Sequence, residues 1–210
     1  MSSSVQLSEV VHPKKEAQAR FDALVGIDDQ KESLVTVLTS LLAPQQLDGW
    51  LKKHHNGDLP FLSKLPTSAP LIVLSGDVGC GKTALATSAA SAVALIIDAR
   101  IAVLETPSDI RGNGLVGDLS ARIVAAFEQA GQRSQKNPTI LIIDESDDLA
   151  TSREQNQAHH EDRAGVNVLL KQLDLVGRER LAMAVIMITN RETALDPAVL
   201  RRASLTLTFT

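Results

Sequence analysis

The sequence predicts an α/β fold in which a mainly parallel sheet is covered by helices on both faces, giving three layers. Short apolar runs, such as 71–74 and 139–143, alternate with longer segments in which apolar residues return at helical spacing. Strands of a parallel sheet are buried on both faces, so they are apolar along their whole length. A glycine-rich loop follows the first of these runs, and two carboxylates follow the second. Both features lie where parallel strands deliver their carboxyl ends to a ligand.

The expected elements follow one another in order along the chain. The expected strands cover 71–74, 94–98, 101–105, 139–143, 182–189 and 205–209. The expected helices cover 17–42 (with a turn at 26–28), 82–92, 119–130, 164–175 and 197–202. Residues 1–16, which begin with a serine run, are interpreted as a flexible N-terminal tail, and residues 45–70, which contain several prolines, as an irregular connector. Residues 17–210 are expected to form one domain.

The composition narrows the class of protein. With 210 residues, 44% of them hydrophobic, the chain can bury a sizeable core. No apolar run approaches the roughly 18 residues that a membrane span needs, and no signal peptide opens the chain, so we expect a cytoplasmic protein without a membrane partner. The single cysteine, Cys80, excludes an internal disulfide framework. A net charge of −4 and 2% aromatic residues weigh against nucleic acid as a partner.

The glycine-rich loop matches the eight-position phosphate-binding loop, with a strand before it and a helix after it. Its residues are Gly76, Asp77, Val78, Gly79, Cys80, Gly81, Lys82 and Thr83, with Ala84 next along the helix. Glycines allow successive backbone N–H groups to curl around phosphate oxygens, and the helix N-terminus adds a partial positive charge. Lys82 would reach the β- and γ-phosphates, and the Thr83 hydroxyl would bind magnesium. The predicted cofactors are therefore ATP and Mg²⁺.

The two carboxylates after 139–143 are the second half of the predicted site. Asp144 would hold the magnesium through water, and Glu145 would orient and polarise the water that attacks the γ-phosphate. Asn190 closes a third apolar strand, so it is a candidate to position that water or the γ-phosphate. This pattern predicts an ATPase.

A short helix near the C-terminus ends in two arginines, Arg201 and Arg202. It begins with Asp196 as a cap and Pro197 at its first position. The arginines could compensate the dipole at the end of the helix, or one of them could reach the ATP of a neighbouring subunit. The sequence alone leaves both readings open.

Taken together and in this order, these motifs resemble those of the AAA+ ATPases. The resemblance implies that Val25 and Gly26 lie over the adenine, that Asn190 is the sensor-one residue, and that Arg202, with Arg201 second, is a finger acting on a neighbouring subunit in a hexamer. It also implies a helical lid beyond the strand at 205–209, which this chain does not contain.

Within that family, the chain is similar to the pachytene-checkpoint ATPases, which remodel HORMA-domain proteins and whose bacterial members accompany antiphage systems. The similarity rests on the paired short strands at 94–98 and 101–105 and on the Arg-Ala-Ser that begins at Arg202. By the same resemblance, Leu115 and Val116 fall in the substrate-gripping pore loop, and 152–162 in a second pore segment.

The predicted function is therefore a Mg-ATP-dependent ATPase that remodels a protein substrate, of the HORMA type, through a hexameric pore. A DNA-directed ATPase, such as a clamp loader, initiator or transposition helper, is the first alternative, and the acidic charge weighs against it. A nucleotide-gated scaffold is the second. Glu145 argues against a scaffold, which has no need of a placed base.

Overall fold

The computed structural model describes residues 5–44, 70–107, 118–144, 146, 160–191, 193 and 195–209, with side chains of α6 from residue 164 onward. Its strands are β1 (Ser8–His12), β2 (Leu71–Gly76), β3 (Ile101–Glu105), β4 (Thr139–Ile143), β5 (Met183–Thr189) and β6 (Ala203–Phe209). Its helices are α1 (Lys15–Ala23), α2 (Asp28–Leu42), α4 (Lys82–Ile97), α5 (Asp118–Ser134), α6 (His160–Glu179) and α7 (Pro197–Leu200).

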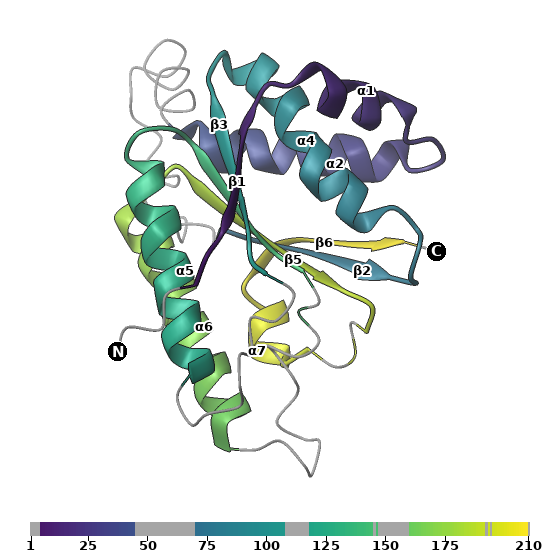
Figure 1. Cartoon of the computed structure of the whole chain (residues 1–210). Helices are drawn as coiled ribbons and strands as arrows, with labels where there is room; N and C mark the ends of the chain where they lie inside the picture. Colours follow the sequence, from purple (N-terminus) through teal and green to yellow (C-terminus); the bar gives the residue numbers. More distant parts are fainter. Residues whose placement is uncertain are drawn as a thin grey trace, which may run out of the picture.

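The described strands form one sheet in the order β1-β3-β4-β5-β2-β6. The pairs β3–β4, β4–β5, β5–β2 and β2–β6 are parallel, and only β1 runs antiparallel, at the edge beside β3. Helices α1, α2 and α4 lie on one side of the sheet, and α5, α6 and α7 on the other (Figure 1). The predicted three-layer fold with a mainly parallel sheet is confirmed.

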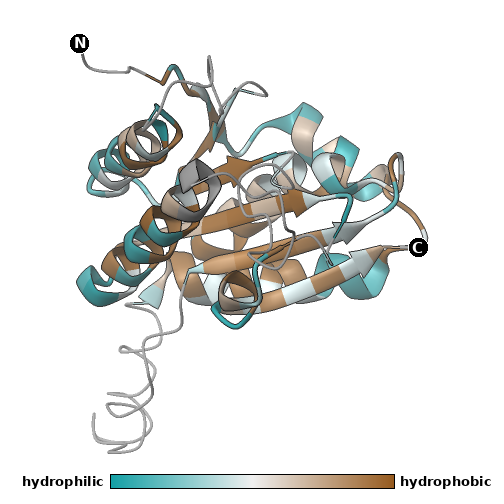
Figure 2. Ribbon diagram, turned by 90° about the horizontal axis from the view of Figure 1, so that it is seen from below, coloured by the Kyte–Doolittle hydropathy of each residue, from teal (hydrophilic) through white to brown (hydrophobic). Residues whose placement is uncertain are grey.

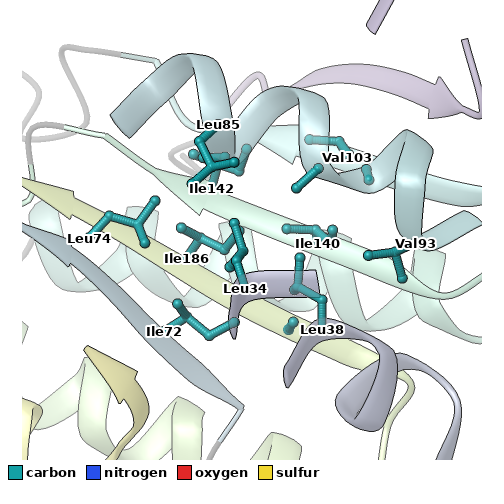
Figure 3. Packing of buried hydrophobic residues seen from close by; sticks show 14 of the residues in the cluster. Leu34, Leu38, Ile72, Leu74, Leu85, Val93, Val103, Ile140, Ile142 and Ile186 are labelled. Atoms are coloured by element: carbon teal, nitrogen blue, oxygen red, sulfur yellow. The ribbon is translucent and has the colours of Figure 1, made fainter. Parts of the chain in front are cut away.

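Two apolar clusters hold the layers together. Successive residues of a strand point to opposite faces, so Ile72 and Leu74 of β2 pack towards α2 and α4, whereas Leu71 and Val73 pack towards α5 and α6. Leu34 of α2 is fully buried against the first of these faces, as Figure 3 shows. The inner strands β2, β4 and β5 are buried along almost their whole length, whereas the edge strands β1 and β6 expose several residues. The helices carry polar outer faces (Figure 2). Burial on both faces explains why the inner strands are continuous apolar runs in the sequence.

The N-terminus departs from the sequence prediction, because Ser8–His12 is a strand of the sheet and not a flexible tail. β1 pairs residue for residue with β3, from Ser8 opposite Glu105 to His12 opposite Ile101. Further contacts fix it: Arg133 Nε donates to Glu9 Oε1 over 2.7 Å. The flexible-tail prediction is wrong for this segment, because the pairing depends on an edge formed by residues far away in the sequence.

The prediction of a strand at 94–98 is also wrong, because residues 94–97 form the end of α4 and Asp98 is its cap. The helix ends at Ile97, and Asp98 takes a left-handed conformation with φ 51°, its N–H donating to the carbonyl of Ala94. Ala94 and Ile97 are buried while Ile96 between them is 57% exposed, which is a helical pattern of burial. Short apolar runs are ambiguous between helix and strand, and here the preceding alanine-rich helix simply continues.

The remaining differences are small. The predicted helix 17–42 consists of α1 and α2, separated by the predicted turn, in which Gly26 has φ 78°. The connector at 45–69 lies outside the described residues. Among the helices that the structure describes, none is both long and apolar enough to cross a membrane.

Candidate functional site: a phosphate-binding loop and its carboxylates

The predicted phosphate-binding loop joins β2 to α4 at the carboxyl edge of the sheet. Gly76 has φ 141°, and a Cβ there would collide with the backbone of Phe209 on the neighbouring strand β6. Gly81, directly before the helix, has φ 93°. Residues other than glycine rarely adopt either of these φ values, so the tight turn requires glycine at both positions. The α4 N-terminus consequently opens onto the concave side of the loop, where an anion is favoured.

Lys82 lies inside this loop. Its side chain is buried, and Nζ donates to the carbonyl oxygens of Gly76 over 2.7 Å and Asp77 over 2.6 Å. The Cys80 thiol donates to the carbonyl of Asp77 over 2.8 Å, on the rim of the same turn. Nζ also lies 3.5 Å from Cys80 Sγ, so its partners among the described residues are all neutral. A buried ammonium in such a setting is matched to an anionic ligand such as a phosphate, because the two opposite charges attract.

Thr83 and Asp144 bring the two sequence motifs together. Thr83 lies in the first turn of α4, and Asp144 directly follows β4. The Thr83 hydroxyl (Oγ1) donates to Asp144 Oδ2 over 3.0 Å. A hydroxyl and a carboxylate side by side are oxygen ligands of the kind that Mg²⁺ prefers. The two residues predicted from the sequence to hold the metal therefore meet at one place, and they fit Mg²⁺.

Asn190 lies at the same edge. β5 pairs with β2 so that Thr189 is opposite Ser75, which places Asn190 beside the start of the phosphate-binding loop. Its side chain is exposed. Glu145 lies outside the described residues, but Ser146, directly after it, is buried and donates to the carbonyl of Ile188 over 2.8 Å. This bond ties the segment after β4 to β5, the strand that ends at Asn190.

The segment between α1 and α2 lies against the phosphate-binding loop. A Cβ on Gly81 would stand 3.9 Å from Leu24 Cδ2, and Val25 next to it is 85% exposed. Lys31 Nζ donates to the Leu24 carbonyl over 3.0 Å and lies 4.8 Å from the centre of the Phe21 ring, so the segment is held in place. An exposed apolar side chain beside the phosphate site is compatible with the adenine contact expected of Val25 and Gly26.

The two arginines lie on another side of the molecule. Arg202 forms a two-point ion pair with Asp174 of α6, and this hydrogen bond lowers the pKa of Asp174. Arg201 is exposed. Within the described residues, no contact joins either arginine to the phosphate-binding loop of its own chain. The sequence did not single out Asp174, because its role appears only when α6 and the end of α7 are packed together.

Most of the expected pore residues lie outside the described residues. These are Leu115 and Val116 and residues 152–159 of the second expected pore segment. His160 begins α6.

The fold and this site together define a P-loop nucleotide-binding protein of the AAA class. Residues 72–210 match the family described as "ATPase family associated with various cellular activities (AAA)". The chain belongs to this family, and the expectation of an ATPase is confirmed by that membership.

Particular relatives define the subgroup. The chain is 41% identical over 206 residues to CD-NTase-associated protein 6 of Escherichia coli (strain MS 115-1), covering 94% of this chain and 66% of that protein. It matches a chain in the structure of the E. coli MS115-1 HORMA:CdnC:Trip13 complex with TM-score 0.89 and 39% identity, over 99% of this chain and 70% of the other. It matches Rhizobiales Trip13 with TM-score 0.73 and 35% identity, over 96% and 68%. The resemblance to the pachytene-checkpoint subgroup is confirmed, although the strand at 94–98 on which it partly rested is not present. The chain spans about two thirds of the length of these relatives.

Proposed function

We propose that this chain binds ATP together with Mg²⁺ and that its hydrolysis of ATP remodels a HORMA-domain protein. The observation that carries the nucleotide half of the proposal is the junction of Lys82, Thr83 and Asp144 at one end of the sheet. Lys82 binds the β- and γ-phosphates, while Thr83 and Asp144 hold the metal. When bound, Mg²⁺ neutralises charge on the phosphates and orients them.

The hydrolytic step is assigned to two further residues. Glu145 follows Asp144 directly in the chain, and we assign it to orient and polarise the attacking water. Asn190, which lies beside the phosphate-binding loop, is assigned to position that water or the γ-phosphate. The main-chain N–H groups of 76–84 bind phosphate oxygens, and Val25 and Gly26 cover the adenine.

The assembly half of the proposal is supported by the Arg202 position and by the relatives. Because Arg202 is fixed on α6 by Asp174, we propose that it serves the ATP of the neighbouring copy in a hexameric ring. The matched structure is a complex of a HORMA protein with a Trip13 protein, which supports a HORMA-type partner for this chain. Leu115 and Val116 are assigned to the pore loop that grips this partner. We place the protein in the cytoplasm, in agreement with its single cysteine.

The test compares ATP turnover by the full-length protein alone, with a HORMA-domain protein from the same genome, and with duplex DNA at several salt concentrations. The proposal predicts that the HORMA protein raises turnover and is itself converted between conformers only when ATP is supplied. Stimulation by DNA that weakens steeply with salt would instead support a DNA-directed ATPase. Tight ATP binding with no turnover under any condition would support the scaffold.

A further inference from the structure

Glu105 is a carboxylate at the carboxyl edge of the sheet for which the motifs assign no task. It ends β3, and its register partner on β4 is Ile142. Val103 and Ile142 both belong to the apolar cluster under α4 (Figure 3). Side chains alternate along a strand, so Glu105 lies on the α4 face, and Asp144, two residues beyond Ile142, follows on the same face. The two carboxylates are therefore neighbours under the first turn of α4.

The surroundings of Glu105 make its charge costly. The side chain is half-buried, and burial together with the nearby Asp144 charge raises the pKa of this carboxyl group. Glu105 lines a pocket of about 510 Å³ together with Thr83, Lys14 and Arg20. Among the described residues, no group donates a hydrogen bond to the Glu105 carboxylate and none forms an ion pair with it. This holds also for Lys14 and Arg20, which line the same pocket. A cation bound beside two neighbouring carboxylates would offset their mutual repulsion.

The neighbours of Glu105 include a residue assigned to hold magnesium. Thr83 shares the pocket with Glu105 and donates to Asp144, so a metal held by Thr83 and Asp144 has Glu105 beside it. The pocket has room for water around such a metal, since each water occupies about 30 Å³. Mg²⁺ keeps several of its waters when it is bound in proteins, and these waters need hydrogen-bond acceptors.

We propose that Glu105 is a positioning residue of the Mg-nucleotide site, whose carboxylate accepts hydrogen bonds from water bound to the Mg²⁺ held by Thr83 and Asp144. The inference rests on the proposed Mg-ATP function and adds to it a residue that sets metal affinity. Outer-shell residues of metal sites typically change metal affinity 10-fold to 100-fold when they are replaced.

The test measures metal dependence of nucleotide binding and does not depend on catalysis. The affinity for a fluorescent non-hydrolysable ATP analogue is determined in EDTA and over a series of Mg²⁺ concentrations. In Glu105→Gln we expect the Mg²⁺ concentration of half-maximal effect to rise about 10-fold. Affinity in EDTA should stay the same or become tighter, because the substitution removes a negative charge near the phosphates.

Two control variants distinguish an effect on Mg²⁺ binding from a general effect of pocket charge or of folding. Glu16→Gln removes a carboxylate that lines the same pocket from α1, and it should leave the Mg²⁺ midpoint unchanged. Glu105→Asp keeps the charge and should lie closer to wild type than Glu105→Gln does, with equal melting temperatures showing that both variants fold.

An unchanged midpoint in Glu105→Gln would overturn the inference, as would an equal shift in Glu16→Gln or equal losses in the two Glu105 variants. If nucleotide binding by the wild type were independent of Mg²⁺, the proposed Mg-ATP function would fail as well. The two failures are therefore distinguishable.

Discussion

The guanidinium of Arg202 forms a bidentate ion pair with the carboxylate of Asp174, with Nε 2.9 Å from Oδ1 and Nη2 3.2 Å from Oδ2. Both side chains are partly exposed, at 36% and 49%. A solvent-exposed ion pair of this kind contributes about 1 kcal/mol or less to stability, so its main effect is to orient the arginine. The pair holds the partly exposed Arg202 side chain against α6.

If Arg202 acts on a neighbouring subunit, Arg202→Ala should bind ATP normally but hydrolyse it slowly in assemblies, because the finger stabilises charge in the transition state. Mixing Arg202→Ala chains with Glu145→Gln chains should restore part of the activity, since some interfaces then pair an intact arginine with an intact base. Steady-state ATPase assays of the mixtures provide the measurement. Arg201→Ala is the matched control and should have the smaller effect. Mixed rings without any rescue would argue against action between subunits.

Lys82→Ala should abolish ATP binding, because it removes the one cation that the structure places within the phosphate-binding loop among the described residues. Cys80→Ala is the control in the same loop. The Cys80 thiol bonds to the Asp77 carbonyl and makes a long contact of 3.5 Å with Lys82 Nζ, and it is uncharged, so its replacement should leave affinity within a few-fold of wild type. Titration calorimetry measures both, and wild-type affinity in Lys82→Ala would contradict the assignment of the loop.

Glu145→Gln should bind ATP as tightly as the wild type while hydrolysing it slower by orders of magnitude. The amide preserves the shape of the side chain but cannot act as a base. Binding is measured by calorimetry and turnover by phosphate release. Asp147→Asn, three positions from the site residue Asp144, serves as a control that removes a nearby charge and should retain turnover. If the Glu145→Gln protein failed to bind ATP, the assignment of Glu145 as the residue that polarises the attacking water would be contradicted.

Leu115→Ala tests the pore assignment. If this side chain grips substrate, the full-length variant should keep basal ATP turnover and lose remodelling of the HORMA protein. If instead the leucine packs in its own subunit, the change should lower thermal stability and turnover together, because loss of a buried leucine costs about 2 to 5 kcal/mol. A melting curve and a remodelling assay distinguish the two results, and normal remodelling would refute the assignment.

His12 should make the stability of the fold depend on pH. It is buried, with Nδ1 2.7 Å from Ser91 Oγ, and burial, followed by the charge of Lys14, lowers its pKa. The unfolded chain takes up a proton below about pH 6.5, whereas the folded chain does so only at lower pH. Stability should therefore fall as the pH drops below about 6.5.

The measurement is the melting temperature of wild type and His12→Asn at pH 7.5 and 5.5. The variant should show a smaller difference between the two pH values than the wild type does. His159→Asn, in the segment expected from the family resemblance to form a second pore loop, is the control and should leave the difference as it is. Equal pH dependence in wild type and His12→Asn would show that His12 carries none of this effect.

The nucleotide site illustrates what contiguous motifs can determine. The loop from Gly76 to Thr83 is continuous in the sequence, and its conformation depends on glycines and on the helix that follows, which are local features. Asp144 could be placed at the same edge because parallel strands deliver their carboxyl ends together, and its bond to Thr83 agrees with that prediction. The sequence by itself therefore determined the fold class and that Thr83 and Asp144, the residues proposed to hold Mg²⁺, meet at one edge of the sheet.

Tertiary structure decided the features that depend on distant partners. Val10 pairs with Val103 across more than ninety residues, so nothing local in β1 shows that it joins the sheet. Glu105 and Asp174 are ordinary acidic residues in the sequence, and their environments arise only when β3 is beside β4 and α6 is beside Arg202. The end of α4 became helical because burial of Ile97 against the sheet settled a choice that a short apolar run leaves open. Propensity and motif chemistry act over a few residues, whereas strand pairing, burial and charge environment are set by the packing of the whole domain.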